Sequence, residues 1–184
     1  SFQSWTKADD IRDFEIEGIS VGDSLLDYFT EEEIRNIKNS YDDKGYIYPK
    51  KDFYSITVRN HKKFSVYDDV KFTLKDKDNT FKIYSLMGVI NYKNNIKDCY
   101  QKLNSIEEDL NQLFKNSDKS GQYEYFHKGD KSGKSKIKAI QYVLDTFDAG
   151  YASCADWSEE IKILDALRVT LMTKEFKLWF NTLY

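Results

Sequence analysis

The sequence contains little proline, histidine or arginine. Proline occurs only at Pro49, and histidine only at His61 and His127. Arginine occurs only at Arg12, Arg35, Arg59 and Arg168. Because arginine is the side chain best suited to bidentate phosphate contacts, its scarcity argues against phosphate recognition. The net charge of −3 also excludes a strong overall positive field that would attract nucleic acid or an anionic membrane.

Long apolar runs are also missing. No stretch approaches the roughly 18 apolar residues that a membrane-spanning helix needs, so we expect no transmembrane segment. Residues 1–11 are mostly polar and lack the charged-then-apolar pattern of a signal peptide. The alternatives are a cytosolic protein and an exported, periplasmic one in its mature form, without the signal peptide.

Apolar and aromatic residues are plentiful. Hydrophobic residues make up 40% of the 184 residues and aromatic residues 16%, which is too apolar for intrinsic disorder. A chain of this length can bury the core of one domain. We therefore predict an N-terminal tail over residues 1–13 and a single α+β domain over 14–184. The polar stretch 117–135 is a possible boundary between substructures.

Helix signals come early in the chain. Gly18 and Gly22 punctuate the segment 14–34, and Asp23 or Ser24 can cap a short helix. Thr30 followed by Glu33 forms a capping box that opens a second short helix. The segment 94–114 has apolar residues at helical spacing along a single stripe, which predicts one long amphipathic helix.

Strand signals lie on both sides of that helix. β-branched residues, aromatic residues and alternation predict strands over 53–58, 70–75 and 81–92, and then over 136–146, 151–156 and 167–171. The segment 117–135 is expected to form turns, and 174–182 a closing helix. This order predicts an antiparallel α+β fold with the strands in two sets around the long helix.

The two cysteines favour export. Cys99 lies on the apolar stripe of the long helix and Cys154 in a later strand. A disulfide between them would close a loop of about 55 residues and stabilise the fold by about 4 kcal/mol. The alternative is two unrelated buried thiols. The absence of a Cys-x-x-Cys arrangement argues against a redox-active pair.

Lysines crowd the segment 128–138. Its run Lys-Gly-Asp-Lys-Ser-Gly-Lys-Ser suggests a phosphate-binding loop, but the glycine required five positions before Gly133 is Lys128. The run therefore predicts a solvated turn or a basic patch for an anionic partner. The members of that patch are Lys128, Lys131, Lys134, Lys136 and Lys138.

Metal-binding and catalytic signals are weak. Residues 116–121 resemble the start of a calcium-binding EF-hand loop, but its twelfth position is His127 instead of the glutamate that the loop requires. We predict no metal and no cofactor. Asp156 and Trp157 follow Cys154 closely, and the simplest interpretation is a strand-end carboxylate beside a core-lining tryptophan.

The stretch Phe14-Glu-Ile-Glu-Gly-Ile-Ser-Val-Gly-Asp-Ser-Leu-Leu-Asp-Tyr-Phe29 and the following Glu-Glu-Glu-Ile34 resemble the start of a group of uncharacterised exported proteins of Pelagibacter-type marine alphaproteobacteria. The Cys99 helix and the Cys154-Ala-Asp-Trp157 segment are similar to the rest of that group. The resemblance implies export to the periplasm and supplies no catalytic residue. The order of glycine-led short helices and a meander to Tyr92 also resembles small outer-membrane assembly lipoproteins and β-lactamase-inhibitor folds.

Three functional hypotheses remain. The leading one is a non-enzymatic, monomeric, exported protein that binds a protein or small ligand, with contacts at Tyr123, Tyr125, His127, Asp156 and Trp157. Aromatic residues near expected loops motivate it: Tyr46, Tyr48, Phe53, Tyr54, Tyr123, Tyr125 and Phe126.

The second hypothesis is a cell-envelope hydrolase in which His127, Asp156 or Asp165 converge in a pocket. The third is an assembly role in which the N-terminal tail or a sheet edge pairs with a partner.

Overall fold

The computed structural model describes residues 10–39, 48–93 and 95–183. Most of the expected tail, residues 1–9, and Tyr46 lie outside this described part. The helical elements are η1 (Ile11–Asp13), η2 (Leu25–Asp27), α1 (Glu31–Asn39), α2 (Ile96–Leu113) and α3 (Lys174–Phe180). The strands are β1 (Phe53–Arg59), β2 (Asp69–Lys75), β3 (Ile83–Tyr92), β4 (Asp118–Lys119), β5 (Tyr123–Phe126), β6 (Lys136–Val143), β7 (Ala149–Asp156) and β8 (Asp165–Met172).

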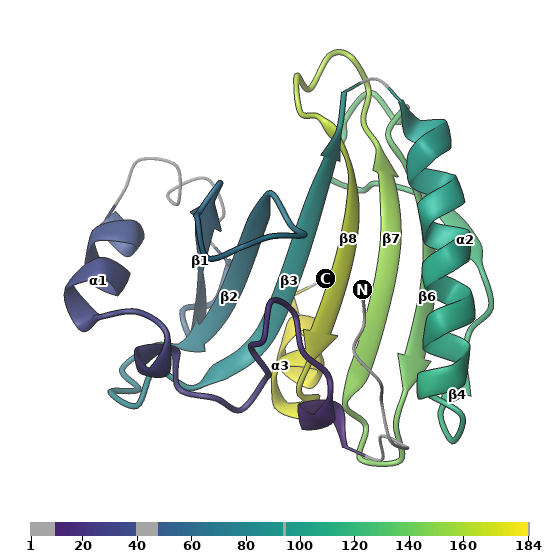
Figure 1. The fold of residues 1–184 in the computed structure, drawn as a ribbon. Helices are drawn as coiled ribbons and strands as arrows, with labels where there is room; N and C mark the ends of the chain where they lie inside the picture. Colours follow the sequence, from purple (N-terminus) through teal and green to yellow (C-terminus); the bar gives the residue numbers. More distant parts are fainter. Residues whose placement is uncertain (1–9, 40–47, 94, 184) are drawn as a thin grey trace.

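All eight strands belong to one antiparallel sheet. Its order is β1-β2-β3-β8-β7-β6-β4, and β5 also pairs with β6 (Figure 1). The α+β class is confirmed, but the expected division of the strands into two sets is wrong. The last strand, β8, pairs with β3 on one side and with β7 on the other, and so joins the early and late strands.

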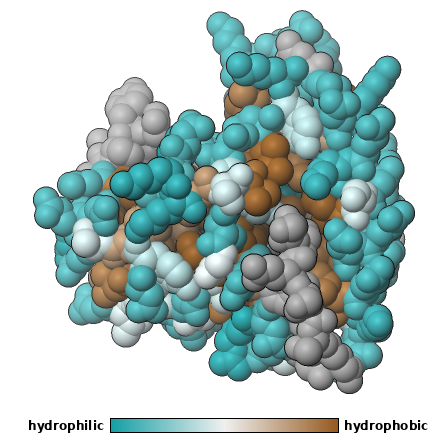
Figure 2. All heavy atoms as spheres, viewed as in Figure 1, coloured by the Kyte–Doolittle hydropathy of each residue, from teal (hydrophilic) through white to brown (hydrophobic). Residues whose placement is uncertain are grey.

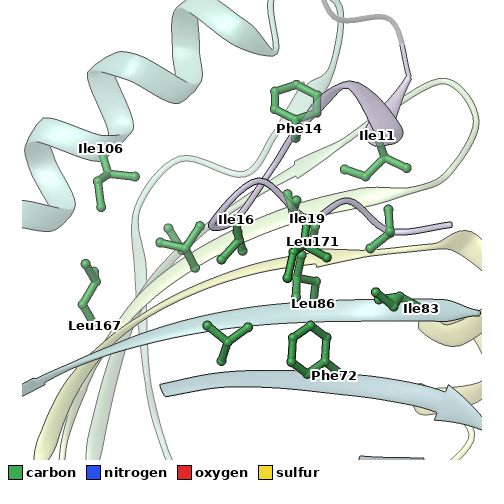
Figure 3. Close-up of a cluster of buried hydrophobic side chains, with 14 of the residues drawn as sticks. Ile11, Phe14, Ile16, Ile19, Phe72, Ile83, Leu86, Ile106, Leu167 and Leu171 are labelled. Atoms are coloured by element: carbon green, nitrogen blue, oxygen red, sulfur yellow. The ribbon is translucent and has the colours of Figure 1, made fainter. Parts of the chain in front are cut away.

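The face of the sheet under α2 carries most of the core. Side chains alternate along a strand, so one face collects apolar positions such as Phe72, Leu86 and Leu167. Helix α2 covers the part of this face formed by β7, β8 and β3 with the stripe that the sequence predicts, formed by Cys99, Leu103, Ile106 and Leu110. Figure 3 shows Ile106 of α2 above Leu167 of β8 in this cluster.

The N-terminal segment covers the same face beside α2. Ile11, Ile16 and Ile19 belong to the same buried cluster as Ile83, Leu86, Leu171 and Phe72 of the sheet (Figure 3). The Phe14 ring stacks on the ring of Phe114, with centroids 4.2 Å apart. Ile11 is only 2% exposed, so the packed core begins inside the segment that the sequence assigns to a tail. Ile11 stands alone among polar residues, so no periodic pattern of apolar residues could predict its burial.

Some apolar surface remains visible on this side of the molecule. The view in Figure 2 is largely hydrophilic, with apolar side chains in the middle, over β3 and β8. Ile90 and Tyr92 of β3 are partly buried and pack against the main cluster. Among the described residues, α2 and the N-terminal segment therefore leave some apolar side chains of this face visible.

The disulfide between Cys99 and Cys154 is confirmed. The bond joins α2 to β7, with the two Cα atoms 5.9 Å apart and both residues fully buried. It lies where the apolar stripe of the helix meets the central strands. The described part of the chain contains no free cysteine.

The short N-terminal helices follow the predicted caps. Ser24 accepts a hydrogen bond from the Leu26 N–H, but η2 is a single 3₁₀ turn, shorter than expected. The capping box at Thr30 and Glu33 is confirmed: each residue's side chain accepts a hydrogen bond from the backbone N–H of the other. Helix α1 therefore begins at Glu31, as the sequence indicates.

Glu17 joins the N-terminal segment to the loop between β1 and β2. Its carboxylate accepts hydrogen bonds from the backbone N–H groups of Ser65, Val66 and Tyr67, at donor–acceptor distances of 2.7–3.0 Å. Partial burial raises the pKa of Glu17, but these N–H donors together bring it below its usual value. Glu17 also has a left-handed backbone, with φ of 56°.

We expect Glu17→Gln to lower the free energy of unfolding by about 1 kcal/mol at pH 7, because the side chain loses its negative charge and one of its two acceptor oxygens. A depressed pKa stabilises the fold above the unfolded pKa of about 4.3, and this contribution is lost as pH falls through the folded value. Urea unfolding at neutral and acidic pH measures the difference. Exposed Glu15→Gln is the control, with a change within about 0.5 kcal/mol. An equal effect of Glu17→Gln at both pH values would contradict the assignment.

Helix α3 covers one end of the opposite sheet face. Phe176 packs with Phe53 and Tyr84, and Trp179 lies against Phe53 with ring centroids 4.9 Å apart. The predicted closing helix is confirmed, and Thr173 caps it. Of the helices in residues 10–39, 48–93 and 95–183, only α3 packs on this face, so the part formed by β5, β6, β7 and the start of β8 has no helical cover.

Candidate binding face

Aromatic side chains gather on the part of the sheet that no described helix covers. The strand register places Tyr123 and Tyr125 of β5 on the same face as Tyr151 of β7 and Arg168 of β8. His127 and Trp157, just beyond β5 and β7, lie on this face as well. We call this set the aromatic face: Tyr123, Tyr125, His127, Tyr151, Trp157 and Arg168.

Three tyrosines form one side of the aromatic face. The rings of Tyr123 and Tyr125 are nearly parallel, with centroids 6.0 Å apart. The hydroxyls of Tyr125 and Tyr151 are 3.0 Å apart and hydrogen-bonded. Burial, and then the bond with Tyr125, raise the pKa of Tyr151 far above its ordinary value, so this hydroxyl stays protonated. Tyr123 and Tyr125 remain 37% and 41% exposed and are available to a partner.

Trp157 forms the other side. The His127 ring meets it edge-on at 4.8 Å between centroids, and the Arg168 guanidinium carbon lies 5.2 Å from its ring centroid. Burial, and then the positive charge of Arg168, lower the pKa of His127. At neutral pH His127 is therefore an uncharged packing residue. The Trp157 backbone N–H donates to Asp165, which fixes the end of β7 to the start of β8.

Small side chains form the floor of the aromatic face. Ala139, Ser153, Ala155 and Thr170 are all buried between the larger rings. Within the described residues, the Thr170 hydroxyl and the Trp157 ring N–H are buried without a hydrogen-bond partner. Such groups are uncommon in folded proteins, and two of them occur on this one face.

Asp156 is separated from the other predicted contacts. It follows the α2-facing Cys154 by two residues and pairs with Lys136, so its side chain lies on the α2 side of the sheet. Burial and the nearby Asp165 raise the pKa of Asp156. Tyr123, Tyr125, His127 and Trp157 come together, whereas Asp156 lies across the sheet from His127. Because the predicted hydrolase needs these groups to converge, the geometry argues against it.

The predicted basic patch extends from the loop between β5 and β6 into β6 itself. Lys134 pairs with Glu160 at 2.6 Å between nitrogen and oxygen, and Lys136 lies 3.6 Å from Glu124. Lys138 lies on the α2 side, with its ammonium group 5.3 Å from the centroid of the Tyr100 ring. Lys128 and Lys131 are on the exposed loop between β5 and β6. Three of the five lysines, Lys134, Lys136 and Lys138, therefore already have a carboxylate or an aromatic ring as a neighbour.

Asp130 organises that loop. Its carboxylate accepts hydrogen bonds from the backbone N–H and hydroxyl of Ser132 and from the N–H of Ser135, each at 2.8 Å. The bonds from Ser135 and Ser132 hold the pKa of Asp130 far below its usual range. The serines of the lysine-rich run thus bind an internal carboxylate, which explains their spacing without a phosphate ligand.

Metal and small-molecule sites are not evident near these residues. Within the part of the chain that is described, no group of three or more His, Cys, Asp or Glu side chains could hold a metal ion. A shallow cavity of about 390 Å³ lies at the 60–68 loop, beside His61, and another of about 230 Å³ lies beside α1. Neither is lined by a residue of the aromatic face.

The comparisons with known proteins identify no relative, so the function of this chain is argued from its own residues. No protein-family model matches this chain, and no curated protein or solved structure matches it significantly. Among the described helices, none is both long and apolar enough to span a membrane.

Three residues of this region were not predicted from the sequence as part of a site: Tyr151, Arg168 and Thr170. Each alternates with a core residue along its strand, so each points to the face opposite α2. Their proximity depends on the pairing of β7 with β8, which places Ser153 beside Arg168 and Tyr151 beside Thr170. The alternation of core and outward-facing residues was visible in the sequence. Without the register of the strands, it could not show that these three residues lie on the same face as Tyr125.

Proposed function

We propose that this chain is a non-enzymatic binding protein that takes a protein partner on the aromatic face. One observation carries the proposal: Tyr123 and Tyr125 are exposed beside Tyr151 and Trp157 on a part of the sheet without helical cover. Tyr, Trp and Arg are the residues most enriched at the energetic centres of protein interfaces. A face that combines all three supports binding.

A protein partner fits this face better than a small ligand does. Small-molecule sites are concave and bury most of the ligand. The two cavities described above lie elsewhere, and the aromatic face is built on a sheet, whose broad surface suits an extended contact. We expect the chain to be monomeric before its partner binds.

The disulfide supports an oxidising compartment for this activity. Such bonds persist in exported proteins and are rare in the reducing cytosol. The Cys99–Cys154 bond is compatible with export to the periplasm or a similar space. We therefore place the proposed binding activity outside the cytoplasm.

A photo-crosslinking amino acid in place of Tyr125 tests the proposal. In an extract of the source organism, we expect one discrete adduct, which an excess of unlabelled wild-type protein removes. The Tyr123→Ala/Tyr125→Ala double variant should not compete. The same crosslinker at Leu178, which is 54% exposed on α3, is the control position. No adduct at position 125, or the same adducts at position 178, would reject the proposed function.

A further inference from the structure

Strand β5 forms part of an edge of the sheet. Among the described strands it pairs only with β6, and all four of its residues are exposed. Three of them are aromatic, and Phe126 is 60% exposed. Proteins usually protect a sheet edge with lysine, proline or a covering segment. An aromatic edge of this kind is expected to pair with another chain.

The backbone of β5 has two residues directed outward. The N–H of His127 donates to the carbonyl of Ser135 at 2.9 Å, so His127 belongs to a hydrogen-bonded pair of the ladder. Since such pairs alternate in antiparallel strands, Tyr125 and Tyr123 also bond toward β6. The N–H and C=O groups of Glu124 and Phe126 therefore point away from the sheet. Within the described residues, no backbone hydrogen bond joins them to another segment.

Positive charge lies next to this edge. In the part of the chain that is described, no ion pair joins Lys128 or Lys131 to a carboxylate, whereas Lys134 and Lys136 are paired. The nearby Asp130 is buried and bonded to Ser132 and Ser135. A strand that runs along β5 and past Phe126 meets these two lysines. Acidic residues at that end of the strand complement their charge.

We infer that β5 accepts an extended segment of the partner protein as an additional strand, with acidic residues opposite Lys128 and Lys131. Backbone bonds at Glu124 and Phe126 supply the pairing, and Tyr123 and Tyr125 contact alternate side chains of the segment. This inference rests on the proposed function and specifies its partner. A second copy of the chain is a poorer occupant, because its β5 brings one carboxylate, Glu124, which already lies near Lys136.

Three synthetic peptides test the inference by fluorescence anisotropy with the full chain. One alternates Glu and Val, the second alternates Lys and Val, and the third is the Glu–Val peptide with N-methyl groups on alternate amides. We expect the first to bind at least about tenfold more tightly than the other two. Equal binding of all three, or no binding of the first, would overturn the inference.

A matched pair of variants isolates the backbone contribution. Glu124→Pro removes the outward N–H but leaves the N–H groups of Tyr123 and Tyr125 in place, whereas Glu124→Ala keeps the N–H and removes the acidic side chain beyond Cβ. We expect the proline variant to lose about tenfold in affinity for the Glu–Val peptide, and the alanine variant less than about threefold. Equal losses would contradict strand pairing.

Two further measurements keep the test decisive. Lys128→Glu/Lys131→Glu should reverse the preference between the Glu–Val and Lys–Val peptides, even if the proline variant does not fold. A concentration-dependent dimer in sedimentation that Glu124→Ala keeps and Glu124→Pro loses would assign the edge to a second copy and overturn the peptide assignment. If the peptides do not bind but the crosslink at position 125 still forms, only the edge inference is rejected. If no crosslink forms at position 125, the proposed function is rejected.

Discussion

Reduction of the Cys99–Cys154 disulfide is expected to lower the free energy of unfolding by about 4 kcal/mol, because the bond closes a loop of 55 residues in the unfolded chain. This is a large part of the roughly 5–15 kcal/mol that stabilises a typical domain. The bond also joins α2 to β7, so its loss weakens the attachment of the helix that covers the core.

Urea unfolding with and without a thiol reductant measures this effect. The Cys99→Ala/Cys154→Ala variant is the control, since its unfolding midpoint should not respond to reductant. We expect the reduced wild type to approach the stability of this variant, within the roughly 1 kcal/mol that small buried cavities cost. An unchanged midpoint, when mass measurement shows two free thiols, would contradict the prediction.

Phe72→Ala is expected to destabilise the fold by about 3–5 kcal/mol, the usual cost of deleting a fully buried phenylalanine ring. Phe72 has no exposed surface, and its ring meets that of Phe29 edge-on at 6.0 Å between centroids. It lies where β2 supports the N-terminal segment (Figure 3). Its removal leaves a cavity between two parts of the core.

Phe126→Ala makes the matched comparison. The same side chain is deleted, but Phe126 is 60% exposed on the sheet edge, so we expect a change within about 0.5 kcal/mol. Chemical denaturation of both variants at neutral pH provides the measurement. Similar losses at the two positions would show that burial at Phe72 is not what stabilises this region.

The local elements could be predicted from the sequence, but the pairing of distant strands could not. The alternation of apolar and polar residues over 70–75 predicted β2, and the apolar stripe from Cys99 to Leu110 predicted α2. The pairing of Ser85 with Met172 joins positions that are far apart in the chain, and no local pattern reports it. The pairing of β3 with β8, to which this contact belongs, joins the two expected sets of strands into one sheet.

Exposure explains the strands that the sequence missed. All residues of β4 and β5 are exposed, so the segment 117–135 has no buried face and no hydrophobic alternation of the usual kind. The repeated Asp-Lys-Ser-Gly favoured turns. That interpretation holds at Asp130, but Asp118 lies in β4. Pairing with β6 overrode the local preference.

The sequence predicted most of the residues of the candidate site but not how they are arranged in space. Aromatic richness identified Tyr123 and Tyr125, and proximity to Cys154 drew attention to Trp157. Asp156 was included with them because it is adjacent in sequence, although neighbouring residues of a strand point to opposite faces. Arg168 could be placed beside Trp157 only once β7 and β8 were paired.

The central position of β8 has a consequence for how the chain folds. Since β8 is the last of the eight strands in sequence and lies between β3 and β7, those two strands each present an open edge until it arrives. A ribosome-bound chain that has not yet released β8 cannot close its sheet, so folding of this sheet must wait until β8 has emerged. During that interval the chain is most exposed to aggregation and most suited to protection by a chaperone.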